Sequence, residues 1–250
     1  QRQSEIAMFA NLLLSSLAFT APVAPRSAAV APRAAPVMET KADLQALAKE
    51  LNPAIGFFDP LGLADADFWG QGNEATIGFL RESEIKHGRV AMAAFVGFIL
   101  HANAVRFPWP QWFGEDVSAI NAITSPPELW DALPPVAKYQ IIGFIGFLEF
   151  WREVGVEKHY MRGGKPGEYP TFQQENFVHP VPLDLFDPFG FSKKKTPEQK
   201  AKGLVKEINN GRLAMIGIFG FLCEAKIPGS VPLLSGIIQG YSGEPMAPFG

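Results

Sequence analysis

The sequence has few of the features that mark several common classes of protein. Cys223 is the single cysteine among its 250 residues, so no internal disulfide can form. The 22 lysines and arginines are outnumbered by 25 aspartates and glutamates, which gives a formal charge of −3 and no basic surface for nucleic acid. A disulfide-stabilised fold and a nucleic-acid partner are therefore both excluded.

The sequence motifs of common enzymes are also missing. The chain contains no GxSxG, no phosphate-binding loop, no CxxC and no HExxH. We therefore expect a protein that is not an enzyme.

Acidic residues are missing from residues 6–38, where Arg26 and Arg33 are the only charged side chains. This segment contains the apolar stretch MFANLLLSSLAF followed by an Ala/Pro-rich stretch, a composition typical of targeting signals. We expect residues 1–38 to be a targeting presequence or a disordered remnant, and residues 39–250 to form the folded domain.

Apolar runs long enough to cross a bilayer are missing as well. The runs 90–100, 141–151 and 213–223 would each form a helix of about 16 Å, whereas a bilayer core is about 30 Å thick. Flanking residues extend these runs to predicted helices at about 74–103, 136–154 and 196–225, and thirty helical residues measure about 45 Å. The pattern predicts an all-α fold, but hydropathy alone leaves open a soluble bundle or three membrane helices.

The chain does contain an internal repeat. ESEIKHGRVAM (82–92) and KEINNGRLAM (206–215) place Glu84 and Glu207 at equivalent positions, 123 residues apart. The same shift superposes Ile85 on Ile208, Gly88 on Gly211, Arg89 on Arg212, Ala91 on Ala214, Met92 on Met215, Gly97 on Gly220 and Phe98 on Phe221. One helix intervenes, so the first and third helices are expected to run in the same direction, crossed about a pseudo-twofold axis.

The charges of the repeat are spaced to pair between the two copies. Within one copy the arginine follows the glutamate by five residues and projects from another side of the helix. We therefore expect Glu84 to pair with Arg212, and Glu207 with Arg89, because an unpaired charge inside a membrane is costly. Small residues would keep the helices close: Gly88, Gly97, Gly211, Gly217, Gly220, Ala91, Ala93, Ala94 and Ala214.

Each ion pair would leave one carboxylate oxygen free. A carboxylate neutralised in this way, the imidazole of His87 and the amide oxygen of Asn210 are suitable fifth ligands for a Mg²⁺ ion that is already held by four ring nitrogens. Chlorophyll has that geometry. These four residues, Glu84, Glu207, His87 and Asn210, are therefore the candidate magnesium ligands.

The repeated pair of motifs closely resembles the three-helix light-harvesting chlorophyll-binding family of thylakoid membranes. The DPxG turns of FFDPLGL (57–63) and LFDPFGF (185–191) stand ahead of the two copies, as in that family. The middle segment KYQIIGFIGFLEFW (138–151) is similar to the chlorophyll a/c branch, which includes fucoxanthin- and peridinin-type antennae. The composition of residues 1–38 likewise resembles the two-part presequences of secondary plastids.

The resemblance implies an integral membrane protein in which residues 39–250 bind chlorophyll a, chlorophyll c and a peridinin- or fucoxanthin-type carotenoid. It adds Gln140, Glu149 and Glu224 as further, weaker magnesium ligands. It also implies that the carotenoid ends lie near the turns Asp59, Pro60, Gly62 and Asp187, Pro188, Gly190. Its partners would be thylakoid lipid, neighbouring antenna proteins and a photosystem core.

Two alternatives remain open on the sequence. A photoprotective relative that dissipates excitation as heat would share the fold and the ligands. A soluble bundle with a di-metal carboxylate site is suggested by Glu84 and His87 at ExxH spacing, but the second copy has Asn210 in place of the histidine.

Overall fold

The computed structural model of the protein describes residues 39–106, 111–112, 115–116, 118–172, 187–244 and 247. All of these residues belong to one compact unit of the chain, Ala35–Gly250. The presequence predicted for residues 1–38 lies outside the described residues, and so do Leu185 and Phe186 of the second DPxG segment.

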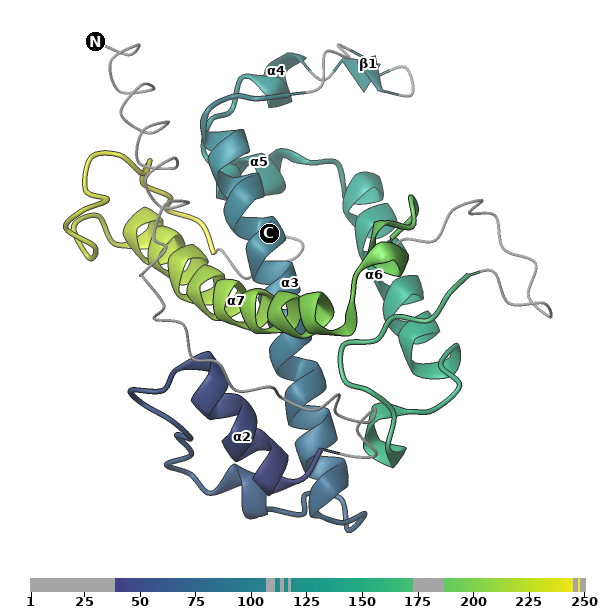
Figure 1. Ribbon diagram of the computed structural model, residues 1–250. Helices are drawn as coiled ribbons and strands as arrows, with labels where there is room; N and C mark the ends of the chain where they lie inside the picture. The colour runs from purple at the N-terminus through teal and green to yellow at the C-terminus, as the bar shows by residue number, and fades with distance from the viewer. Residues whose placement is uncertain are drawn as a thin grey trace. The chain divides into compact units, whose positions relative to one another are not determined.

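The described elements are almost all helical (Figure 1). The α-helices are α2 (Lys41–Leu51), α3 (Asn73–Ala102), α4 (Ser118–Asn121), α5 (Pro126–Ala132), α6 (Pro135–Val154) and α7 (Pro197–Lys226). Three 3₁₀ helices, η1 (Leu63–Asp65), η2 (Tyr160–Arg162) and η3 (Phe191–Lys194), lie in the connections. The strands β1 (Gln111–Trp112) and β2 (Glu115–Asp116) pair antiparallel. The all-α prediction is confirmed apart from this pair of two-residue strands.

The three long helices begin and end within one residue of their predicted bounds. The start of α7 follows from its sequence: the Thr196 hydroxyl accepts the Gln199 N–H, the Gln199 side chain accepts the Thr196 N–H, and Pro197 occupies the first helical position. A similar capping box, between Thr40 and Asp43, begins α2. The sequence analysis did not predict α2, although this signal was present.

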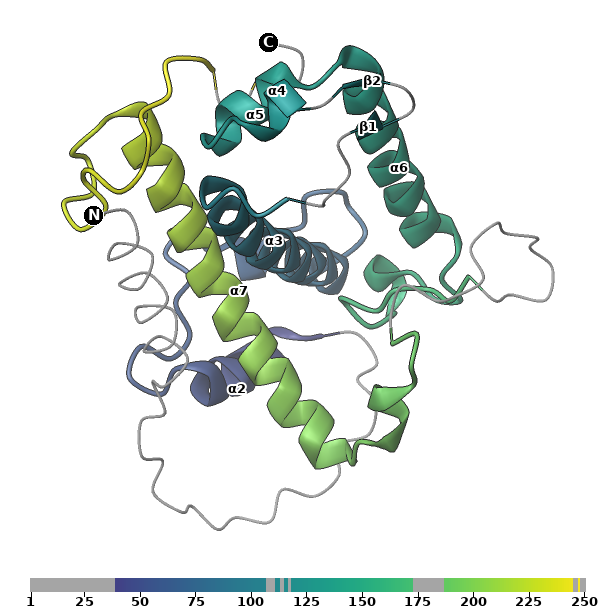
Figure 2. The same cartoon turned by 90° about the horizontal axis from the view of Figure 1, so that it is seen from above.

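α3 and α7 cross with their backbones in contact, and they pack together more extensively than any other pair of described elements (Figures 1 and 2). A Cβ atom added to Gly211 would lie 2.9 Å from the Cα atom of Gly88. Ile85 and Ile208 are both buried beside this contact. The predicted crossing of the first and third helices is therefore present, and it is centred on equivalent glycines of the repeat.

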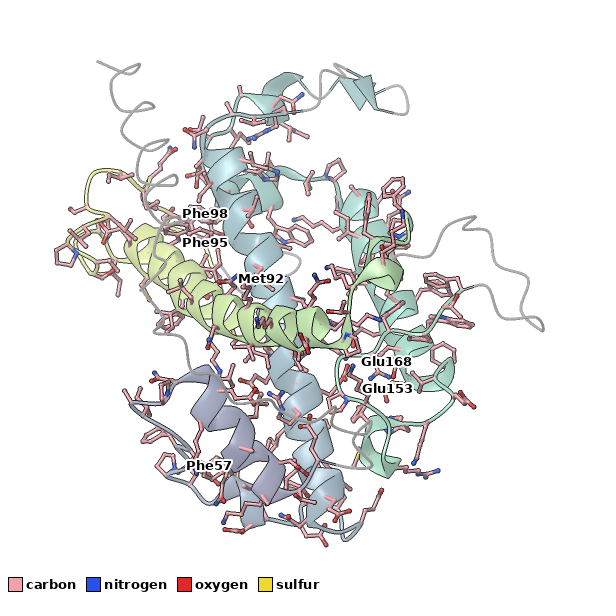
Figure 3. All side chains as sticks on the ribbon, viewed as in Figure 1. Phe57, Met92, Phe95, Phe98, Glu153 and Glu168 are labelled. Carbon is pink, nitrogen blue, oxygen red and sulfur yellow. The ribbon has the colours of Figure 1, made fainter. Side chains whose placement is uncertain are left out.

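Aromatic rings continue the contact toward the carboxyl end of α3. The Phe95 ring stacks on Phe221 with centroids 4.9 Å apart, and Phe98 lies 5.0 Å from the same ring (Figure 3). Gly217 faces Phe95, because a Cβ atom there would lie 2.8 Å from the ring. Gly97 and Gly220 have nothing within 4 Å of an added Cβ atom, so the prediction that they allow the close approach was wrong.

α6 lies to one side of the crossed pair and packs on α3 and α7 far less than they pack on each other (Figure 2). Two ion pairs connect it to α3, Lys86–Glu149 and Arg152–Glu82. Most of its apolar side chains are exposed, among them Ile141, Ile142, Phe144, Ile145 and Phe150. Near the carboxyl end of the helix, the rings of Phe147 and Trp151 stack on Phe172. The helix is thus fixed to α3 by charged contacts, and most of its remaining apolar surface is exposed in the described residues.

In the part of the chain that the structure describes, no helix is both long enough and apolar enough to cross a membrane. The three membrane spans therefore remain a prediction.

Tyr241 connects the segment after α7 to α5. Its N–H donates to Ala225 O at 2.7 Å, and its hydroxyl donates to Asp131 Oδ2 at 2.6 Å. This hydrogen bond and the burial of the ring raise the pKa of Tyr241 to about 12. The end of α7 is thereby joined to α5, in the connection that precedes α6.

The glycine contact predicts a difference between two substitutions in one helix. Gly211→Ala should lower the free energy of unfolding by about 1–3 kcal/mol, because the new methyl group meets the backbone of Gly88, which cannot move away alone. Gly220→Ala should raise it by about 0.5–1 kcal/mol, since that position is open and alanine favours the helix. Thermal unfolding followed by far-ultraviolet circular dichroism measures both, and equal midpoints for the two variants would contradict the contact.

Candidate functional site

Two ion pairs flank the glycine contact and exchange charges between α3 and α7. Arg89 Nε donates to Glu207 Oε1 at 2.6 Å, and Arg212 Nε donates to Glu84 Oε1 at 2.7 Å. The arginine side chains are 41% and 46% exposed, whereas those of Glu207 and Glu84 are 32% and 25% exposed. The carboxylates therefore lie nearer the crossing, with the guanidinium groups outside them, in the reciprocal arrangement expected from the repeat.

The two carboxylates differ in a way that the sequence analysis did not predict. Glu84 Oε2 accepts a hydrogen bond from Arg81, one turn earlier on α3, so both of its oxygens have a guanidinium partner. Among the described residues, Glu207 Oε2 has no such partner. The expectation of one free oxygen holds for Glu207 and was wrong for Glu84.

His87 is exposed on α3 and its hydrogen bond fixes which ring nitrogen is free. Nδ1 lies 2.7 Å from the carbonyl oxygen of Ser83. A carbonyl oxygen can only accept, so Nδ1 carries the proton and Nε2 of the neutral ring keeps its lone pair. The backbone thus orients His87 as a nitrogen donor that points away from α3.

The amide candidates lie on helix surfaces. Asn210 and Gln140 are both exposed, on α7 and α6. The preceding Asn209 is used structurally, because its side chain donates to Leu51 O at 3.2 Å. Of the two neighbouring asparagines, Asn210 is therefore the one whose side-chain amide is available to a ligand, and it lies three residues after Glu207.

Glu149 on α6 has a cation from α3 beside it. Its Oε2 lies 2.5 Å from Lys86 Nζ, and its side chain is half exposed. This arrangement repeats on α6 the feature seen at the crossing, a carboxylate neutralised by a residue of another helix.

Glu224 is used differently from the predicted magnesium ligand. Its two oxygens accept the N–H groups of Gly229 and Val231, both at 2.8 Å, and the residue is 1% exposed. Lys226, two residues further on, donates to the carbonyl oxygens of Ser242 and Gly243 and not to Glu224. The carboxylate is therefore enclosed by the turn after α7, which corrects its assignment as a ligand.

The two DPxG turns have similar local structures, although φ is positive at Asp187, at 53°, and not at Asp59. Asp59 accepts the N–H groups of Leu63 and Ala64 at 3.0 and 2.9 Å, while Asp187 accepts the N–H of Ser192 at 2.6 Å. Gly62 and Gly190, with φ of 65° and 70°, provide the left-handed residue that each turn needs before its 3₁₀ helix. The N–H of Ala64 is the main reason that the pKa of Asp59 is lowered from 3.8.

A buried ion pair near the crossing was not predicted. Arg152 of α6 donates to both oxygens of Glu82, at 3.2 and 2.8 Å, and the two side chains are 4% and 6% exposed. The peptide of Gly167 joins this pair to the crossing: its N–H donates to Glu82 at 2.6 Å and its carbonyl accepts from Arg89 at 2.6 Å. Charged residues beside each motif were the only signal in the sequence.

The geometry does not provide a bare metal centre. No group of three or more histidine, cysteine, aspartate or glutamate side chains that could hold a metal ion occurs in the described residues. What the site offers is single donors, spaced along the surfaces of α3, α6 and α7.

Comparison with known proteins tests whether the chain belongs to the pigment-binding family that its repeat resembles. The sequence profile of the family described as chlorophyll A-B binding protein matches residues 43–226, which include both copies of the repeat and α6. The chain belongs to the chlorophyll A-B binding protein family.

Three named relatives show how similar the chain is to fucoxanthin-chlorophyll a-c binding proteins. The chain is 34% identical over 190 residues to a fucoxanthin-chlorophyll a-c binding protein of Trieres chinensis, covering 73% of this chain and 79% of the relative. It is 31% identical over 226 residues to fucoxanthin-chlorophyll a-c binding protein F of Phaeodactylum tricornutum, covering 89% and 96%. Protein A of this name from Macrocystis pyrifera is 34% identical over 175 residues, covering 69% of each chain.

Family membership confirms the resemblance on which the sequence interpretation rested. A member of the chlorophyll A-B binding protein family is a light-harvesting antenna protein and not an enzyme. The soluble di-metal bundle is therefore wrong.

The first DPxG turn predicts that its own stability depends on pH. Because the pKa of Asp59 is lowered in the folded protein, its contribution to stability is complete above the ordinary value of 3.8 and is lost as the pH falls through the folded value. Hydrogen exchange of the Leu63 and Ala64 amides, corrected for intrinsic rates, should lose protection in that range.

Asp59→Asn removes the titrating carboxyl group, so protection of these amides should no longer change as the pH falls through that range. The exposed Asp65→Asn is the matched control, and it should keep the wild-type profile. A wild-type profile in Asp59→Asn would contradict the role of this carboxylate.

Proposed function

We propose that the protein is an integral thylakoid antenna that spans the membrane three times, holds chlorophyll a, chlorophyll c and a fucoxanthin-type carotenoid, and passes excitation to a photosystem. One observation carries this proposal: two glutamates at a glycine crossing, each paired with the arginine of the other helix. The sequences named as fucoxanthin-chlorophyll a-c binding proteins, all called chloroplastic, support the pigment set and the plastid location.

The lengths and surfaces of the helices support the membrane assignment. The 30 residues of α3 and of α7 measure about 45 Å, and the 20 residues of α6 about 30 Å, comparable with a bilayer core of about 30 Å. Residues 90–100 and 213–223 carry no charged side chain. Large apolar side chains are exposed on all three helices: Val90, Val96, Leu100, Ile141, Phe144, Ile145, Phe150, Leu213, Ile216 and Phe219.

The donor set fits the magnesium of chlorophyll. Glu207 keeps one oxygen without a partner in the described residues, His87 keeps Nε2, and the Asn210 amide is open. Glu84 would bind through an oxygen that it shares with an arginine. Gln140 and Glu149 would be weaker ligands on α6, and the bound chlorophylls supply light absorption and excitation transfer.

The protein's own contribution is position and environment. The glycine contact fixes the two glutamates relative to each other, and the ion pairs keep their charges from being exposed to lipid. The apolar surface of α6, which has little protein around it, would be covered by pigment and lipid. The turns at Asp59–Gly62 and Asp187–Gly190 would hold carotenoid ends, with Pro60 and Pro188 restricting the backbone.

The same fold could dissipate excitation instead of passing it on. Fluorescence lifetimes of the purified complex at neutral and low pH separate the two roles. We expect a long lifetime that does not change with pH, and a marked shortening in acid would favour the dissipative role.

The exchanged pairing predicts that an arginine substitution removes a pigment. Arg89→Leu leaves Glu207 without its cation, so it should lose about one chlorophyll per polypeptide, as Glu207→Leu should. The free energy of unfolding should fall by about 3 kcal/mol, the lower end for an orphaned buried charge, because the pair is partly exposed. Reconstitution with chromatographic pigment counting measures the loss, and a fully pigmented Arg89→Leu protein would refute the pairing as a basis for ligation.

The orientation of His87 predicts a second pigment loss. His87→Leu removes the Nε2 donor and should lose about one chlorophyll while the helices stay assembled. Ser83→Ala is the control, because it keeps the backbone carbonyl that orients the ring and should keep full pigment. Unchanged stoichiometry in His87→Leu would exclude it as a ligand.

A further inference from the structure

Arg81 is an additional charged residue at the crossing, and the proposed ligation does not require it. The residue is only 5% exposed. Its Nε donates to Glu39 Oε2 at 2.9 Å, and its Nη1 donates to Glu84 Oε2. The remaining nitrogen, Nη2, is buried and has no hydrogen-bond partner among the described residues. A buried guanidinium shared by two carboxylates from different segments is a specific arrangement and not a solvated surface contact.

The second copy of the repeat has no counterpart of Arg81. The 123-residue shift places Leu204 at the equivalent position. Glu84 therefore lies between two guanidinium groups, those of Arg212 and Arg81, whereas Glu207 has that of Arg89 alone in the described structure. The backbones of the two helices are equivalent at the crossing, but the charge around the two carboxylates is not.

This difference has a consequence for any ligand bound to the two glutamates. A second cation draws electron density from the Glu84 carboxylate and makes it a weaker donor than Glu207. The same cation adds a fixed positive charge on one side of whatever binds there, within a partly buried site where screening is weak. Two chemically identical pigments on the two glutamates would therefore differ in excitation energy.

Arg81 also connects the site to the amino-terminal part of the folded unit. Glu39 immediately precedes Thr40, the N-cap residue of α2. α2 contacts α7 as well, through Leu51 O and Asn209. The start of α2 is thus tied to the Glu84 carboxylate by one side chain, and a change in the position of this segment would change how Arg81 is shared between Glu39 and Glu84.

We propose that Arg81 is a positioning residue that makes the chlorophyll on Glu84 energetically distinct from the one on Glu207, and that Glu39 sets how strongly it does so. This inference rests on the proposed function, because it requires both glutamates to hold a pigment. The difference between the two copies of the repeat, Arg81 in one and Leu204 in the other, would then set which of the two chlorophylls has the higher excitation energy.

The test compares a charge removed at one site with a charge added at the other. Glu84→Leu and Glu207→Leu, reconstituted with pigment, identify the absorption band of each site by its loss in low-temperature difference spectra. Arg81→Leu should then shift the Glu84 band alone. Leu204→Arg should shift the Glu207 band alone and in the opposite direction, because removing and adding a cation at equivalent positions are opposite perturbations.

The outcomes separate the two hypotheses. If neither glutamate variant loses pigment, the proposed function fails. If both lose pigment but Arg81→Leu leaves the Glu84 band in place, the role of Arg81 is overturned and ligation stands. If Arg81→Leu does not assemble, Leu204→Arg decides alone, and an unshifted Glu207 band overturns the proposal. Arg81→Lys keeps the charge and should restore most of the Glu84 band position.

A measurement that does not depend on pigment spectra tests the link to α2. Glu39→Gln should speed hydrogen exchange in residues 41–51 several-fold, because the charged contact with Arg81 is lost. Glu50→Gln, an exposed change in the same helix, is the control and should leave exchange unchanged. Equal exchange in the two variants would overturn the connection through Glu39.

Discussion

The close contact between Gly88 and Gly211 is the constraint on which the arrangement of charges depends. Because the two backbones touch there, each arginine of the repeat reaches across to the glutamate of the other helix. The ion pairs in turn leave carboxylates that are neutralised but not fully enclosed. A ligand-bearing acid can therefore exist among apolar surroundings without the cost of an isolated charge.

α6 is held by a different principle. It has little packing against the crossed pair and is attached through Arg152–Glu82 and Lys86–Glu149, which both lie toward its carboxyl end. A helix fixed in this way keeps its apolar faces available along most of its length. In a pigment-binding protein this is an advantage, because the space beside the helix is not filled by side chains. Charged contacts thus attach α6 to α3, and much of the apolar surface of α6 stays exposed in the described residues.

The sequence predicted the parts of the structure that depend on local or repeated patterns. The three long helices and the exchange between Arg89 and Glu207 followed from spacing and from known helix signals. Contacts between unrelated segments could not be predicted: neither Arg152 beside Glu82 nor Arg81 beside Glu39 has a pattern that names its partner. Glu224 was misassigned because the resemblance that suggested it as a ligand says nothing of the turn whose N–H groups it accepts. Gly97 and Gly220 were misassigned because a helix presents glycine equally to a neighbour or to open space.

The peptide of Gly167 has a consequence for how the family can vary. Its N–H and carbonyl bind Glu82 and Arg89, its φ is +78°, and an added Cβ atom would lie 2.9 Å from Ile85. The chain must therefore travel from the end of α6 at Val154 to one fixed point on α3. The number of residues between Val154 and Gly167 therefore limits how far α6 can lie from the crossed helices. Insertions or deletions there would change the spacing between whatever is bound on the two sides of the gap between α6 and these helices, while the crossing itself stayed the same.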